Sequence, residues 1–123
     1  MTWNIIAIMV IEMREPTFWV LTVLAAGRRH GYALMQEAKN LSDGRVDLKV
    51  ATLYASLERL GKQGLVVADG DETVDGRTRR YFRLTAEGER ALTDQIQRIE
   101  ANAKQAKSRL AALDRTNPIG TAS

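Results

Sequence analysis

The pattern of apolar side chains marks three helical segments in the first half of the chain. Residues 17–26 are almost wholly apolar, with Pro16 suited to the first turn of a helix and Gly27 to its end. Residues 30–41 and 50–61 instead place apolar residues three and four positions apart, with polar residues between them. The pattern predicts one helix that is buried on nearly all sides, followed by two amphipathic helices.

A change of period marks the next part of the chain. Residues 65–68 favour a strand, and residues 81–84 alternate apolar with polar side chains. Between these segments, Asp75-Gly76 is a favoured two-residue hairpin turn, because both turn positions require positive φ. The pattern predicts a β-hairpin with a long exposed tip, and Thr85 is suited to cap the helix that follows.

The last predicted helix carries a heptad seam. Its apolar positions are spaced four and three residues apart in alternation: Leu92, Ile96, Ile99, Ala103, Ala106, Leu110 and Leu113. A helix over residues 86–113 is about 42 Å long at roughly 1.5 Å per residue, which is longer than a domain of this size can cover. We therefore expect part of the seam to contact a second copy of the chain and form a homodimer. The alternative is that the seam packs on its own domain.

Together these elements predict a mainly α fold. It is a winged helix-turn-helix of three helices and a two-stranded β-wing, with a long C-terminal dimerisation helix. The expected organisation is an N-terminal helical extension over 1–15, the winged domain over 16–85, the dimerisation helix over 86–115 and a disordered tail over 116–123.

The extension contains an apolar run over residues 5–11. This run is too short to cross a membrane and lacks the basic start and cleavage site of a signal peptide. It is either a dimer-packing helix or a segment upstream of a natural start at Met13. We expect a cytoplasmic protein with no membrane partner.

Composition narrows the chemistry that the chain can perform. It has no cysteine and a single histidine, His30, which leaves few groups for a metal site or a catalytic triad. No spacing of titratable residues suggests acid–base or nucleophilic catalysis, so we expect neither an enzyme nor a cofactor. The 18 Lys and Arg residues exceed the 15 Asp and Glu residues by three, and 13 of the 18 are arginine. This bias weakly favours nucleic acid, because the guanidinium pairs bidentately with phosphate and guanine.

The second helix of a helix-turn-helix pair enters the DNA major groove, so the third predicted helix is the candidate for base contacts. Val50, Leu53 and Leu57 are expected to anchor this helix to the core. Its expected outward residues are hydrogen-bonding types: Thr52, Ser56, Arg59 and Lys62. Tyr54 lies between the two faces. Either its hydroxyl contacts a phosphate, or it is a partly buried residue with only its tip in water.

The predicted hairpin is the stronger candidate for a DNA contact. It carries Arg77, Arg79, Arg80 and Arg83 within seven residues. A narrow β-ribbon can place such guanidiniums along a phosphate backbone, whereas a protein-interaction module of the same fold has no need of them. We therefore expect a sequence-specific regulator of transcription that binds double-stranded DNA. The alternative is a winged-helix protein-interaction module that does not bind DNA.

Short phrases of sequence occur in an order that adds to this interpretation. They are Met13-Arg14-Glu15-Pro16-Thr17-Phe18, Gly27 through His30-Gly31-Tyr32, Thr52-Leu53-Tyr54, Leu57-Glu58-Arg59-Leu60, Gly64-Leu65, Asp75-Gly76-Arg77, Arg80-Tyr81-Phe82 and Leu84-Thr85-Ala86-Glu87-Gly88. In these phrases, which cover residues 13 to about 92, the chain resembles the PadR family of bacterial transcriptional regulators. The resemblance implies a homodimeric repressor, often of a neighbouring detoxification or efflux gene, that is released by a small aromatic effector.

One segment departs from the family pattern. Where the family usually has Ser-Pro-Gly at the start of the third helix, this chain has Lys49-Val50-Ala51, so the usual serine cap and first-turn proline are absent. Asp47 is the expected replacement cap, and Lys49 adds a candidate phosphate contact.

The implied effector also has few candidate residues in this chain. Family members that hold flat drugs use aromatic residues lining the dimer channel, but the C-terminal helix here has none. Phe18 and Trp19 of the first helix are therefore the candidate effector-binding residues. The alternative is that both belong to the hydrophobic core.

Overall fold

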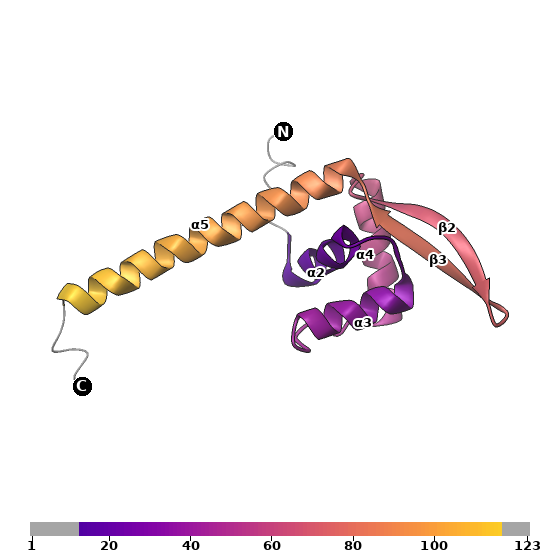
Figure 1. The fold of residues 1–123 in the computed structure, drawn as a ribbon, viewed down its shortest axis with the longest axis horizontal. Coiled ribbons are helices and arrows are strands. Elements are labelled where there is room, and N and C mark those ends of the chain that lie inside the picture. Colours follow the sequence, from indigo (N-terminus) through magenta and orange to yellow (C-terminus); the bar gives the residue numbers. More distant parts are fainter. Residues whose placement is uncertain (1–12, 117–123) are drawn as a thin grey trace. The chain divides into compact units, whose positions relative to one another are not determined.

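The computed structural model describes residues 13–116 of the chain. The elements follow in the order α2 (Glu15–Ala25), β1 (Arg29–His30), α3 (Gly31–Leu41), α4 (Val50–Lys62), β2 (Val66–Val74), β3 (Arg77–Leu84) and α5 (Ala86–Thr116) (Figure 1). The helices before the hairpin, the hairpin and the long final helix are thus confirmed. The chain forms two compact units, one ending at Leu92 and the other beginning at Thr93.

Three helices supply most of the apolar core of the first unit. Leu21 of α2, Leu34 of α3 and Leu53 of α4 are fully buried, and each burial contributes roughly 1.5–3 kcal/mol. The other core residues come from these helices, the loops, the sheet and the start of α5: Val20, Val23, Leu24, Ala38, Val46, Leu48, Leu57, Leu60, Leu65, Val66, Phe82 and Leu92. Most positions that helical spacing assigned to the core are therefore buried.

A buried serine fixes the connection between α3 and α4. The Ser42 hydroxyl donates to the carbonyl of Lys39 at 3.2 Å and accepts from the backbone N–H of Val46 at 2.9 Å. Val46 and Leu48 then insert into the core. These contacts set the point at which α4 begins.

The sheet has three antiparallel strands in the order β1-β3-β2. The short strand β1 pairs with the base of β3, placing Arg29 opposite Phe82 and His30 opposite Tyr81. The sequence pattern predicts only two strands, so β1 is a correction to the expected wing. A strand of two residues has no periodicity of its own and is defined only by its partner.

The β2–β3 hairpin, called the wing below, is longer than the pattern predicts. Its turn is the expected one, with φ of 52° at Asp75 and 77° at Gly76. The register shifts between Ala68 and Asp71, which indicates a bulge in β2. The strands nevertheless stay paired out to Val74 and Arg77 beside the turn.

Thr85 caps α5 as expected. Its hydroxyl accepts from the backbone N–H of Gly88 at 3.0 Å and donates to the carbonyl of Gly64 at 2.6 Å. Leu92 is 7% exposed and joins the core, so the first turns of α5 belong to the first unit.

Two expectations fall mostly outside the described residues. They are the helical extension over 1–15, with its apolar run, and the disordered tail over 116–123. α5 continues to Thr116. Within residues 13–116, every helix is too short or too polar to cross a membrane.

Candidate nucleic-acid interface

The face of α4 turned away from the core differs along its length. Leu53, Leu57 and Leu60 bind the helix to the core, because they recur at three and four residues. The exposed residues of the helix are Val50, Ala51, Thr52, Tyr54, Ala55, Glu58, Arg59, Gly61 and Lys62. The first turns thus expose mainly small and apolar side chains, and the charged ones lie further along.

Two residues of α4 face the opposite way from the expectation. Ser56 is only 9% exposed, whereas Val50 is 60% exposed. Ser56 lies three residues after Leu53 and four before Leu60, so it shares their buried side, and its small side chain fits there. The prediction that Ser56 points outward, with Val50 in the core, is therefore wrong.

The expected cap of α4 is also wrong. Lys49 is the residue preceding the first turn, and no side chain caps the helix there. The Asp47 carboxylate instead lies 3.6 Å from the ammonium of Lys39. Lys49 itself is exposed, so its charge is accessible to an anion.

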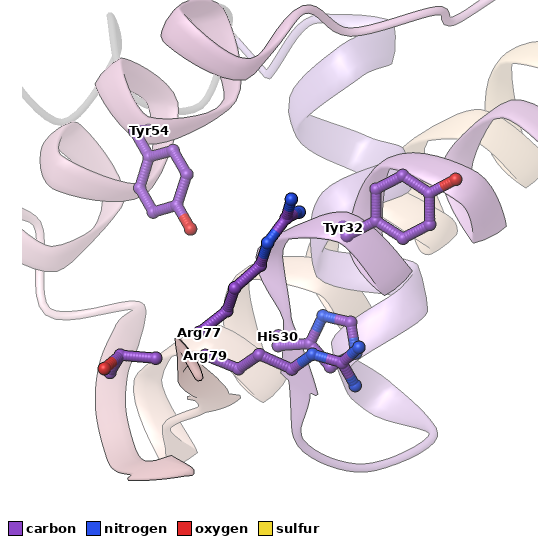
Figure 2. Close-up of a pocket in the computed structure, with 6 residues that line it drawn as sticks. His30, Tyr32, Tyr54, Arg77 and Arg79 are labelled. Carbon is purple, nitrogen blue, oxygen red and sulfur yellow. The ribbon is translucent and has the colours of Figure 1, made fainter. Parts of the chain in front are cut away.

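A cleft of about 350 Å³ lies between the start of α3, α4 and the wing. It is lined by His30, Tyr32, Tyr54, Arg77, Thr78 and Arg79, and is called the cleft below (Figure 2). Figure 2 shows Arg77 extending from the wing into the space between Tyr32 and Tyr54. The structure thus brings together three predicted DNA-binding residues, Tyr54, Arg77 and Arg79. Sequence reasoning missed His30, Tyr32 and Thr78 as part of this group.

The wing arginines differ in their pairing. Arg80 forms an ion pair with Asp71 at 3.4 Å, and Arg83 lies 4.0 Å from Asp69. Within residues 13–116, no carboxylate forms an ion pair with Arg77 or Arg79. The cleft therefore contains two guanidiniums that form no ion pair among the described residues, although Glu72 lies opposite Arg79 in the strand register, whereas the charge of Arg80 is partly neutralised by Asp71.

Tyr54 and His30 are held in place by local contacts. A Cβ at Gly31 would lie 2.6 Å from the Tyr54 hydroxyl oxygen, so glycine at this position leaves room for the ring beside α3. His30 caps α3, its Nδ1 accepting from the backbone N–H of Ala33 at 3.3 Å. Its ring also meets Tyr81 edge-on, with the centroids 5.4 Å apart. The walls of the cleft are thus fixed by α3 and the sheet.

The remaining basic residues of α4 have partners in the chain. The Arg59 guanidinium donates to the Thr17 hydroxyl at 2.9 Å and so ties α4 to α2. Lys62 lies 3.4 Å from Glu58, one turn earlier on an exposed face. Such an exposed pair is weak, at about 0.3–0.5 kcal/mol, so Lys62 can exchange Glu58 for a phosphate.

Phe18 and Trp19 are half-buried on α2 and pack against the core. Their rings meet edge-on with centroids 5.1 Å apart. The Trp19 indole N–H donates to Glu15 Oε1 at 3.2 Å. The Arg45 hydrogen bond, followed by that of Trp19, holds the pKa of Glu15 below its ordinary value. Both rings thus pack against the core and remain partly exposed.

The heptad seam divides at the boundary between the two units. Leu92 is buried in the core of the first unit, so the expectation that it lies in a dimer interface is wrong. In the second unit Ile96, Ile99 and Leu110 are 41%, 44% and 62% exposed, and Ala103 and Ala106 are exposed as well.

Comparison with known proteins identifies the family. The model of the transcriptional regulator PadR-like family matches residues 20–94. Over 76 residues the chain is 40% identical to the transcriptional regulator Rv3488 of Mycobacterium tuberculosis, covering 62% of this chain and 67% of that protein.

Solved structures confirm the fold class. A PadR family transcription regulator from Clostridium difficile superposes with a TM-score of 0.65 at 22% identity, over 79% of this chain and 99% of the other. PadR of Bacillus subtilis in complex with operator DNA superposes with a TM-score of 0.60 at 20% identity, over 68% of this chain and 48% of the other. The molecule thus has the winged-helix fold of transcriptional regulators with a long C-terminal helix. The chain belongs to the transcriptional regulator PadR-like family.

Proposed function

We propose that this protein is a homodimeric repressor that binds double-stranded DNA. In this proposal α4 enters the major groove and the wing lies along the phosphate backbone. The observation that carries it is the cleft, where Arg77 and Arg79 lie beside α4 and form no ion pair among the described residues. The PadR of Bacillus subtilis, which shares the fold, was solved with operator DNA, and this supports the assignment.

The cleft has the chemistry that a phosphate requires. Guanidiniums bind phosphate oxygens through two parallel N–H donors, and the Tyr54 hydroxyl supplies a further donor in the cleft. A phosphate seated here lies between α4 and the wing, so the backbone contact fixes the depth of α4 in the groove. Lys49 and Lys62, at the two ends of α4, extend the positive surface.

Dimerisation supplies a second DNA-binding surface, which contacts the second half-site of the operator. The exposed apolar side chains of Ile96, Ile99 and Leu110 share one face of α5 and would be covered by the same helix of a second copy. A two-fold dimer presents two α4 helices to half-sites whose centres are about 10 base pairs apart. Repression follows because the occupied operator is closed to other proteins.

The wing assignment predicts a change in the salt dependence of DNA binding. Arg77→Ala with Arg79→Ala should weaken binding to all sequences. The slope of log K against log salt should fall by about 0.9 for each lost phosphate contact, or roughly 3–4 for two arginines in each of two protomers. Fluorescence anisotropy at several salt concentrations measures both quantities.

The matched control is Arg80→Ala with Arg83→Ala, which removes the same charge from the same strand but from arginines that have acidic partners. This control should change the slope much less. If the two double variants behave alike, the cleft does not hold phosphate. Affinity that is insensitive to salt even in the wild type would favour the protein-interaction module.

The proposal also includes regulation, in which a small aromatic effector binds the protein and releases it from the DNA. The accessible edges of Phe18 and Trp19 offer burial and stacking to a planar ligand. The Trp3→Phe variant leaves Trp19 as the sole tryptophan reporter. We expect a planar aromatic compound to quench its emission and to weaken DNA binding over the same concentration range. If no compound does both, regulation by this route is excluded.

A further inference from the structure

The first turns of α4 expose methyl groups beside the hydroxyls of Thr52 and Tyr54. Val50, the first residue of the helix, is 60% exposed, and Ala51 and Ala55, one turn apart, are exposed as well. The buried position of Ser56 removes one of the polar side chains expected at this surface. The start of α4 therefore presents an accessible apolar surface from Val50, Ala51 and Ala55 in addition to the two hydroxyls.

The charges around this surface restrict what it can bind. Lys49 immediately precedes Val50, and Arg77 and Arg79, which form no ion pair within residues 13–116, lie on the wing beside α4. An apolar protein partner would have to desolvate these cations, whereas a polyanion pairs with them. A molecule that binds this surface of α4 must therefore present an apolar group flanked by phosphates.

The DNA major groove presents only one apolar group, the C5-methyl of thymine. N-terminal residues of a groove-binding helix are the ones that contact base edges. Alanines at positions 51 and 55 do not fill the space between the helix and the bases, so the backbone can approach closely. Val50 has two methyl groups, enough to cover one thymine methyl.

Building on the proposed function, we propose that Val50 contacts a thymine methyl group in each half-site of the operator, with Ala51 and Ala55 allowing the close approach. The apolar first turn then selects thymine over cytosine at that base pair. This selectivity replaces hydrogen-bonded readout from Ser56, which faces the core.

The test uses deoxyuridine, which pairs like thymidine but lacks the methyl group. Each thymine of a duplex selected from random DNA by the wild-type protein is replaced in turn by uracil. At one thymine position, which occurs once in each half-site, we expect replacement by uracil to weaken binding about 4-fold per half-site. This is the equivalent of about 0.8 kcal/mol for one methyl group. Substitution at the other thymines should have a smaller effect.

The Val50→Ala variant links that methyl to its protein partner. It should bind the thymine and uracil duplexes within 2-fold of each other, because the side chain no longer reaches the methyl group. Val50 is exposed and alanine favours helices, so the variant should fold as the wild type does. Val67→Ala is the matched control, because Val67 is a 39% exposed valine on β2 and its loss should preserve the 4-fold difference.

The outcomes separate this inference from the proposed function. If the protein selects and binds DNA but is indifferent to uracil at every thymine, the inference is wrong and the proposed function stands. The same conclusion follows if Val50→Ala retains the full thymine preference. If the protein binds no DNA, both are wrong.

Discussion

The Ile99→Asp variant is expected to be monomeric at micromolar concentration and to bind its operator about 100-fold or more weakly than the wild type. Ile99 is 44% exposed in the single chain and lies in the middle of the apolar face of α5. In the proposed dimer a carboxylate there would be buried without a partner. Loss of the dimer removes the second half-site contact, and linked sites of this kind gain about 10²–10⁴ in avidity.

Sedimentation equilibrium and DNA titration measure the two effects on the same samples. Ala101→Asp is the matched control, because it introduces the same charge into α5 at an exposed position two residues from Ile99, on the opposite side of the helix. The control should remain dimeric and bind DNA normally. A dimeric Ile99→Asp variant, or a monomeric wild type, would exclude the seam as the interface.

Gly88→Ala is expected to lower the free energy of unfolding by about 3 kcal/mol, at the upper end of the range for overpacking. A Cβ at this position would clash with the carbonyl oxygen of Leu65 and lie 2.7 Å from Cδ1 of Leu84. The Leu65 oxygen cannot simply move away, because it accepts the backbone N–H of Thr85 at 3.0 Å. The added methyl group therefore separates the start of α5 from the sheet.

Chemical denaturation compares this variant with Gly61→Ala. Gly61 is also helical, but the nearest atom to its added Cβ is 3.8 Å away, at the Val66 carbonyl. Removing a helix glycine without a clash should stabilise by about 0.5–1 kcal/mol. Equal stabilities for the two variants would show that the space at Gly88 adjusts and that the tight contact is not required.

The elements of the fold could be predicted where the signal is local. An apolar run between Pro16 and Gly27 located α2, helical spacing located α3 and α4, and the Asp75-Gly76 dipeptide fixed the wing turn through its own backbone preference. Thr85 could be predicted as the cap of α5 because its own hydroxyl accepts a hydrogen bond from the first turn of the helix. β1 could not be predicted, because Arg29 and His30 form a strand only by pairing with residues about 50 positions later.

The residues of the candidate site could be predicted only where the side chain itself carries the signal. Tyr54, Arg77 and Arg79 have side chains that can bind a phosphate, so composition and spacing made them candidates, and the structure places all three in the cleft. His30 and Tyr32 enter the cleft only because β1 pairing places the start of α3 beside the wing. The opposite orientations of Val50 and Ser56 depend on where the core ends along α4, and helical spacing does not specify this at the first turn.

Selection of bound duplexes from a random DNA library tests the central claim most directly, because it requires DNA binding, sequence preference and two-fold symmetry together. For the wild-type protein we predict enrichment of an inverted repeat whose half-site centres lie about 10 base pairs apart. A library that shows no enrichment over the input at low salt, where phosphate contacts are strongest, would contradict the account.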